Sequence, residues 1–293
     1  MAVIRGLPGV FRDAKAVLAE GIVWDEAGDL LWCDITAGLL HRSPIDGPPD
    51  GSGDTVVRMP PPLASFALAA SGGYVVSLGD RVVSADGSGT VTAELAAIDH
   101  GPGILRLNEG KCDPYGRWVT GSMSLTGEPD GAMYSVTAGG ELRLLRGGLG
   151  VANGFEWSLD DSEMFFTDTS VGTIYRAPYG RDGGLGEVKP FHSGLAHDGL
   201  TIDAEGCLWS AIYGGGRVVR YRPDGREDLS VELPVPNVTS VAFGGAGRST
   251  LFVASARENL TEAQLEEHPL SGAIFAVETS TNGRRARLFG DPE

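Results

Sequence analysis

The 293-residue sequence has few cysteines and no long hydrophobic run. Its three cysteines, Cys33, Cys112 and Cys207, are an odd number, lie far apart and form no C-x-x-C motif. This pattern argues against a disulfide framework or a thiolate zinc site, and it is typical of a reducing compartment. The N-terminus lacks the apolar segment of a signal peptide, and no apolar run is long enough to cross a membrane. We therefore expect a soluble, cytoplasmic protein.

Positive charge is also scarce. The chain has 23 Lys and Arg against 39 Asp and Glu, which gives a formal net charge of −16. An acidic surface repels nucleic-acid phosphates and anionic lipids, so we expect no nucleic-acid partner and no membrane partner. Four familiar motifs are missing as well, namely G-x-S-x-G, H-E-x-x-H, the P-loop and G-x-G-x-x-G. The sequence therefore gives no sign of a serine-hydrolase elbow, a zincin or a nucleotide site of these types.

Helical periodicity is nearly absent, whereas turn residues are abundant. Only residues 260–268 have the pattern of a short helix. The 44 glycines and 17 prolines are spread along the chain without a collagen-like period or a Gly/Ser-rich tract. A TIM barrel or a Rossmann fold needs helices between its strands, so both are disfavoured. The composition favours many short strands that are joined by tight turns.

A repeat organises these strands. Six stretches each contain an apolar strand, a turn and a second apolar strand, and they begin at positions 20, 65, 108, 153, 198 and 239. The spacing of about 40–45 residues leaves room for four strands per repeat, as in a β-propeller blade. We expect an all-β, six-bladed β-propeller that forms a single domain over residues 1–293. Residues 1–19 and 270–290 remain to close the ring.

The first residue of every repeat is polar, although an apolar strand follows it. In a propeller these positions line a central channel, where burial of a polar group is costly unless a partner satisfies it. Asn and Asp also begin strands because they form Asx-turns, which explains any one of these residues alone. A cation explains their convergence better, and all-oxygen ligands suit Ca²⁺, Mg²⁺ or Mn²⁺. The six residues are Glu20, Ser65, Asn108, Asn153, Asp198 and Thr239.

Other candidates lie beside this ring. Arg106 precedes Asn108 by two residues, so in a continuous strand both side chains point the same way. Arg106 has two interpretations: a bidentate contact with a substrate oxygen, or an ion pair with Glu109 or Asp99. Asn108 is open to a metal, a metal-bound water or the substrate. His197 adjoins Asp198, and we expect it to be an ordinary loop histidine.

Four of the repeat motifs resemble those of a known family. They are AEGIVWDEAGDLLWCDI, RLNEGKCDPYGRWVTGSM, ANGFEWSLDDSEMFFTDT and HDGLTIDAEGCLWSAIYGGGRVVRYRPDG. Together they are similar to the SMP-30/gluconolactonase/regucalcin-like (LRE) family over residues 14–279. The resemblance implies a six-bladed propeller with one divalent cation in its channel. It also implies that Glu20, Asn153 and Asp198 are metal ligands, that Arg106 and Asn108 bind substrate, and that Asp198 is the general base.

The resemblance predicts a metal-dependent lactonase that acts on a small-molecule sugar lactone. We expect Ca²⁺ as the cofactor, with Zn²⁺, Mn²⁺, Mg²⁺ and Fe²⁺ as alternatives. Two other functions stay open: hydrolysis of another ester, such as a phosphotriester or a natural-product lactone, and a non-catalytic propeller that binds calcium or a metabolite. The sequence leaves open the particular lactone, the oligomeric state and whether Glu128 or His197 contacts substrate.

Overall fold

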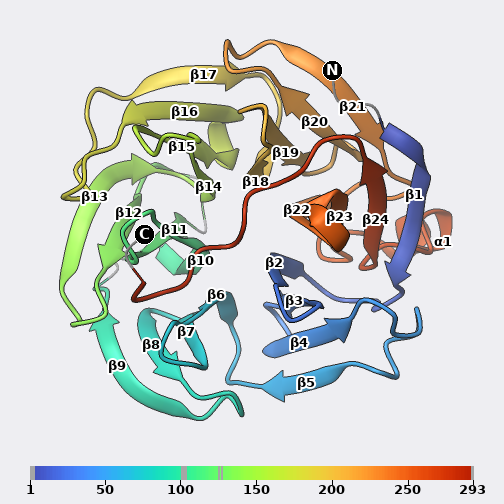
Figure 1. Cartoon of the computed structure of the whole chain (residues 1–293), viewed down its shortest axis with the longest axis horizontal. Coiled ribbons are helices and arrows are strands. Elements are labelled where there is room, and N and C mark those ends of the chain that lie inside the picture. Colours follow the sequence, from blue (N-terminus) through green and yellow to red (C-terminus); the bar gives the residue numbers. More distant parts are fainter. Residues whose placement is uncertain (1–3, 100–103, 125, 127, 292–293) are drawn as a thin grey trace. The chain divides into compact units, whose positions relative to one another are not determined.

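Antiparallel sheets account for almost all regular structure in the computed structural model, which describes residues 4–99, 104–124, 126 and 128–291. The described strands form six sheets of four strands each (Figure 1). One edge strand of each sheet contains one of the six polar repeat positions, and these six edge strands are called the first strands below. The predicted fold class, an all-β six-bladed β-propeller, is confirmed. The single domain over residues 1–293 stays a prediction.

One compact unit comprises residues 1–56 and 198–286 and contains three sheets. Two of them follow chain order: β2 (Ala19–Asp25), β3 (Asp29–Asp34), β4 (Leu39–Pro44) and β5 (Thr55–Arg58), then β18 (His197–Ile202), β19 (Leu208–Ile212), β20 (Arg217–Tyr221) and β21 (Glu227–Glu232). The third joins the two ends of the chain in the order β1 (Ile4–Arg12), β24 (Ile274–Thr279), β23 (Thr250–Ser255) and β22 (Val238–Gly244). The N-terminal segment thus completes the last repeat.

The second compact unit comprises residues 57–197 and 287–293 and contains the other three sheets. Its first sheet consists of β6 (Leu63–Leu68), β7 (Tyr74–Leu78), β8 (Arg81–Ala85) and β9 (Val91–Ala97). The next consists of β10 (Ile104–Cys112), β11 (Trp118–Ser124), β12 (Gly131–Val136) and β13 (Leu142–Leu149). The last consists of β14 (Ala152–Trp157), β15 (Glu163–Asp168), β16 (Thr173–Pro178) and β17 (Lys189–Ser193). All neighbouring strands therefore follow one another along the chain.

Helices are short and lie in connections between strands. The expected helix within residues 260–268 is α1 (Glu262–Glu267), and two 3₁₀ turns are η1 (Thr169–Val171) and η2 (Ala246–Arg248). A capping box between Thr261 and Gln264 begins α1. None of the helices in the described part of the chain is long and apolar enough to span a membrane. Cys33, Cys112 and Cys207 are buried free thiols, as the sequence predicts.

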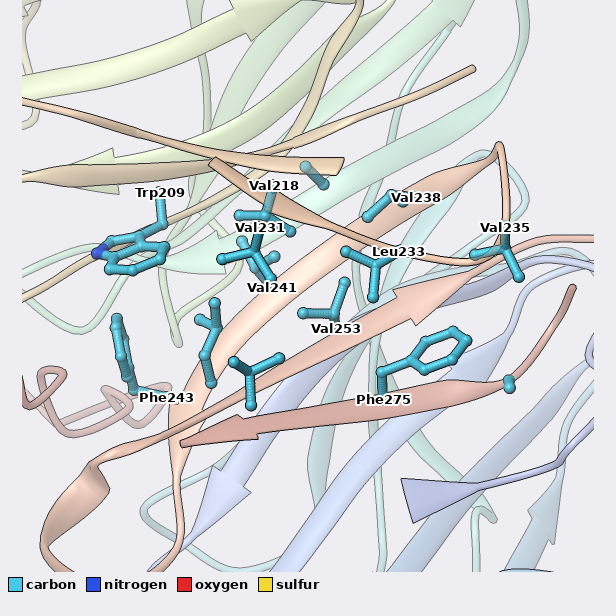
Figure 2. Packing of buried hydrophobic residues seen from close by; sticks show 14 residues of the cluster. Trp209, Val218, Val231, Leu233, Val235, Val238, Val241, Phe243, Val253 and Phe275 are labelled. Carbon is cyan, nitrogen blue, oxygen red and sulfur yellow. The ribbon is translucent and has the colours of Figure 1, made fainter. Parts of the chain in front are cut away.

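Aromatic and β-branched side chains fill the spaces between the sheets. In the first unit, Trp209, Phe243 and Phe275 pack with valines from β20 to β24 (Figure 2). The Trp209 and Phe243 rings meet edge to face, with centroids 5.6 Å apart. In the second unit, Trp118 Nε1 donates to Ser77 Oγ of the neighbouring sheet at 3.0 Å. Trp209 and Trp118 therefore both serve packing of the core.

A network of ion pairs around buried Arg220 stabilises the sheet that contains Asp198. The guanidinium of Arg220 is only 2% exposed, and its Nε donates to Asp203 Oδ2 at 2.8 Å. It also pairs with Asp228 and with Glu205. Trp209 Nε1 donates to the same Asp203 oxygen at 2.9 Å. Arg220 is thus the common partner of the two buried carboxylates, Asp203 and Asp228.

Replacing Arg220 with methionine should destabilise the protein by about 3–5 kcal/mol, because Asp203 then stays buried without a charged partner, while Asp228 keeps only Arg222. The matched control is Arg222→Met. Arg222 binds Asp228 too, but its side chain is 51% exposed, so we expect a loss of at most about 1 kcal/mol. Urea unfolding measures both changes. Equal effects of the two variants would contradict the role of burial.

Candidate functional site

The six polar repeat positions are all buried. The exposed fractions are 9% for Glu20, 1% for Ser65, 7% for Asn108, 6% for Asn153, 5% for Asp198 and 0% for Thr239. Buried carboxylates and amides are expensive unless protein groups or a bound ligand satisfy them. This burial supports the idea that the repeat positions are more than strand-initiating turn residues.

Register shifts of the kind that a β-bulge produces lie at or beside this position in β2, β6, β10, β14 and β22. The register shifts fall between Glu20 and Val23 in β2, and between Asn153 and Glu156 in β14. Comparable shifts occur in the other three strands, β6, β10 and β22. Gly21 and Gly154 adopt left-handed φ values of 60° and 47° directly after Glu20 and Asn153. A bulge re-aims the side chain beside it, and bulges are common next to active sites.

In the second unit, Arg106, Asn108 and Asn153 form a continuous hydrogen-bonded chain. Arg106 Nη1 donates to Asn108 Oδ1 and to the carbonyl of Leu107. Asn108 Nδ2 donates to Asn153 Oδ1 at 3.1 Å, and Asn153 Nδ2 donates to Thr169 Oγ1 at 3.2 Å. The structure thus brings together three of the five predicted site residues. The side-chain oxygens of the two asparagines are fixed in direction by these bonds.

A charged cluster supports the same two strands. Lys111 Nζ of β10 and Glu156 Oε2 of β14 form an ion pair at 2.9 Å. Glu109 lies inside the β10 bulge, where its Oε1 accepts the Gly110 N–H at 2.8 Å. Burial raises the pKa of Glu109, while Lys111 and the N–H groups of Gly110 and Gly154 oppose that rise. Hydrogen bonds and charge therefore tie the strand of Asn108 to the strand of Asn153.

In the first unit, Glu20 and Asp198 lie near a common neighbour, Tyr213. Burial raises the pKa of Tyr213, and the carboxylates of Glu258, Asp198 and Glu20 raise it further, while a hydrogen bond from Asn259 opposes the rise. Tyr213 directly follows β19, the strand that neighbours β18 and Asp198, and its hydroxyl donates to the Glu258 carbonyl at 3.4 Å. Glu20 Oε2 also accepts the N–H of Gly21 at 3.1 Å. Two of the three predicted metal ligands thus share one polar environment.

Tyr213 belongs to a polar group that the repeat pattern does not predict. Its hydroxyl accepts from Asn259 Nδ2 at 2.9 Å and from Asn237 Nδ2 at 3.3 Å, and donates to the Glu258 carbonyl at 3.4 Å. Thr36 Oγ1 donates to Glu258 Oε1 at 3.2 Å. These residues lie in loops between strands or just before a strand, so they have no equivalents at a fixed period. A sequence search for equivalent positions cannot detect them.

The sequence prediction that His197 is an ordinary loop histidine is wrong. It begins β18 and is completely buried. Its ring meets His192 edge to face at 5.4 Å, and its carbonyl accepts the Thr169 hydroxyl at 2.7 Å. Burial and His192 lower the pKa of His197 to about 3. Glu128, the other open candidate, is exposed in the loop between β11 and β12.

The donor chemistry of Glu20, Asn153 and Asp198 fits a hard cation. The three side chains offer two carboxylates and one amide oxygen, and all are buried. Among the described residues, no group of three or more His, Cys, Asp or Glu side chains is placed to hold a metal ion. The predicted ligand set has only two such residues and relies on an asparagine, so it would not form a group of that kind.

Comparison with known proteins places this geometry in context. Residues 18–257 match the model of the SMP-30/gluconolactonase/LRE-like region. The chain is 36% identical to 6-deoxy-6-sulfogluconolactonase of Pseudomonas putida, with 94% of this chain and 95% of that protein covered. It is 35% identical to L-arabinolactonase of Azospirillum brasilense, with 98% and 97% covered. The crystal structure of regucalcin from Agrobacterium tumefaciens, described as a calcium-binding protein, has a TM-score of 0.88 at 29% identity, with 97% of each chain covered.

Proposed function

The chain belongs to the SMP-30/gluconolactonase/LRE-like family, and we propose that this lactonase opens a sugar lactone with a divalent cation held by Glu20, Asn153 and Asp198. The observation that carries the proposal is the burial of polar groups at one repeat position on six strands. The names of relatives at 35–36% identity support a sugar lactone as substrate. We propose the cytoplasm as its location.

The proposed cofactor is Ca²⁺. The all-oxygen donor set supports a hard cation, and the similar regucalcin is described as a calcium-binding protein. Zn²⁺, Mn²⁺, Mg²⁺ and Fe²⁺ are the alternatives to be tested. When bound, a divalent cation would polarise the lactone carbonyl and stabilise the negative charge that develops on its oxygen.

The chemical roles fall to the residues of the first strands. Asp198 accepts a proton from the water that attacks the carbonyl carbon. The bond from that carbon to the ring oxygen then breaks, Asp198 returns the proton to the departing ring oxygen, and the product is an open-chain hydroxy acid. Arg106 and Asn108 together hold the lactone. The guanidinium of Arg106 can donate hydrogen bonds to the lactone oxygens. Asn108 orients that guanidinium through its side-chain oxygen, since the amide N–H groups of Asn108 bind Ala152 and Asn153. The bond between Arg106 and Asn108 keeps both groups aligned before substrate arrives.

A panel of lactones tests this function, because each ring opening releases one acid equivalent. The purified protein is supplied in turn with Ca²⁺, Zn²⁺, Mn²⁺, Mg²⁺ and Fe²⁺, and proton release is followed with an indicator. We expect at least one sugar lactone to be hydrolysed well above the spontaneous rate. If no lactone is hydrolysed with any metal, the lactonase proposal fails and a binding role replaces it.

Replacing Arg106 with alanine should raise KM by about tenfold or more and change kcat much less. The reason is that a lost hydrogen bond from a charged donor weakens ground-state binding by roughly 1.5–3 kcal/mol, and Arg106 is proposed to bind rather than to react. Initial rates over a range of lactone concentrations separate the two constants. A fall in kcat with an unchanged KM would instead assign Arg106 to transition-state stabilisation.

A further inference from the structure

The polar group around Tyr213 lies at the end of the first unit where Glu20 and Asp198 lie. Backbone bonds fix this position, since Arg257 and Glu258 both donate their N–H groups to the carbonyl of Val17, at 3.0 and 2.8 Å. Val17 precedes Glu20 by three residues, and Leu18 forms a bridge with Ala256. The segment that begins at Ala256 therefore runs beside the entry to β2.

Tyr213 and Asn237 reach the same place from two other sheets. Tyr213 directly follows β19, and a tight turn joins β18 to β19, so the end of β19 lies beside the start of β18 and Asp198. Asn237 directly precedes β22, and its carbonyl accepts the Ala256 N–H at 2.9 Å. Three sheets of one unit thus contribute to a single polar group.

Within this group the hydroxyl of Tyr213 is fully used, whereas acceptors of two neighbouring residues are free. The Tyr213 hydroxyl accepts two amide N–H groups and donates to a carbonyl, which fixes the ring. Asn237 Nδ2 also donates to the Glu258 carbonyl at 2.8 Å. Glu258 Oε2 and Asn259 Oδ1 have no protein partner within the described ranges. Asn259 is exposed and Glu258 is half-buried, so both oxygens are accessible from solvent.

These two acceptors suit a ligand with several hydroxyl groups. A carboxylate oxygen and an amide oxygen accept hydrogen bonds and cannot be satisfied by a carbonyl-rich or apolar ligand. They come from consecutive residues, so they can receive two neighbouring hydroxyls. Preorganisation lowers the entropic cost of binding, and here Tyr213, Asn237 and Thr36 hold the segment in place.

We infer that Glu258 and Asn259, positioned by Tyr213 and Asn237, form a specificity subsite for the hydroxyl groups of the sugar lactone. This inference rests on the proposed function, because it places the sugar ring beside Glu20 and Asp198. It goes further in assigning recognition of the sugar to the 256–260 segment. The subsite accepts hydrogen bonds from the substrate, whereas Arg106 donates them.

Glu258→Gln tests the subsite with two lactones that have the same ring size. For glucono-1,5-lactone, which has several hydroxyls, kcat/KM should fall about tenfold or more, because hydrogen bonds to a charged acceptor are worth at least this factor. For δ-valerolactone, which has none, kcat/KM should change less than about twofold. Glu267→Gln is the matched control, since Glu267 is exposed on α1, and it should alter neither value. Tyr213→Phe, which keeps the ring, should reproduce the selective loss in weaker form.

Calorimetric binding of gluconolactam, the ring-nitrogen analogue, separates this inference from the proposed function. Wild-type protein should bind the lactam, and Glu258→Gln should weaken binding about tenfold. If wild-type protein hydrolyses no lactone but shows this loss of binding, the lactonase proposal fails and the subsite stands. Equal effects of Glu258→Gln on both lactones, or unchanged lactam binding, would overturn the subsite.

Discussion

Replacing Asp198 with asparagine should lower kcat by about 10²–10⁴-fold, the usual contribution of a general base. Asparagine keeps the size of the side chain and its carbonyl oxygen but cannot accept a proton at neutral pH. Asp198 is 5% exposed at the start of β18, so the substitution also removes one buried negative charge. The rates are measured with saturating metal, since a weakened metal site would otherwise produce the same loss.

Asp224→Asn is the matched control for this prediction. Asp224 lies in the turn between β20 and β21 of the same sheet, and its side chain is 49% exposed beside Arg226. The control should keep the wild-type kcat. Near-normal turnover by Asp198→Asn with saturating metal would remove Asp198 as the base and transfer the role to Glu20, the other carboxylate near Tyr213.

The fold could be predicted because the strand–turn–strand pattern recurs at a nearly constant interval in the sequence. An apolar strand, a turn rich in Asp and Gly, and a second strand recur, and each recurrence forms the first two strands of one sheet. The six repeats leave residues 1–19 unassigned, so the sequence also predicts that this segment helps to close the ring, and β1 completes the last sheet. Local patterns sufficed here because nearly all neighbouring strands are neighbours in sequence.

The candidate site could be predicted only where it follows the repeat. Glu20, Asn153 and Asp198 occupy one repeat position, and each is followed by a glycine. The bulges at Gly21 and Gly154 explain that pairing, since an L side chain rarely adopts a left-handed φ. Tyr213, Glu258 and Asn259 lie in connections of different length, where no periodic signal exists.

His197 shows the limit of local reasoning in another way. A histidine that follows Gly194 and precedes a strand has the pattern of a loop residue. The Thr169 hydroxyl comes from the connection between β15 and β16, and the His192 ring comes from β17. Its burial is a tertiary effect, and desolvation then depresses its pKa to about 3.

Removing bound metal should abolish lactone hydrolysis, and Glu20→Gln should make activity depend on much higher metal concentrations. EDTA treatment followed by gel filtration is expected to reduce the rate to the spontaneous value, with recovery when the native cation is added back. An amide in place of a carboxylate lowers the charge of the ligand set, which weakens binding of a dication. We expect the half-saturating metal concentration to rise at least roughly tenfold, because even residues beyond the ligands can change metal affinity by this much.

Glu26→Gln is the control for Glu20→Gln in this metal titration. Glu26 lies beyond the same strand, β2, and its exposed side chain pairs with Arg248. The titration curve of Glu26→Gln should overlie that of the wild-type protein. Full activity after chelation, or an unchanged titration for Glu20→Gln, would refute a metal held by Glu20, Asn153 and Asp198. Because the carboxylates of Glu20 and Asp198 raise the pKa of Tyr213, Tyr213 should also titrate at higher pH in the chelated protein than in the metal-loaded protein.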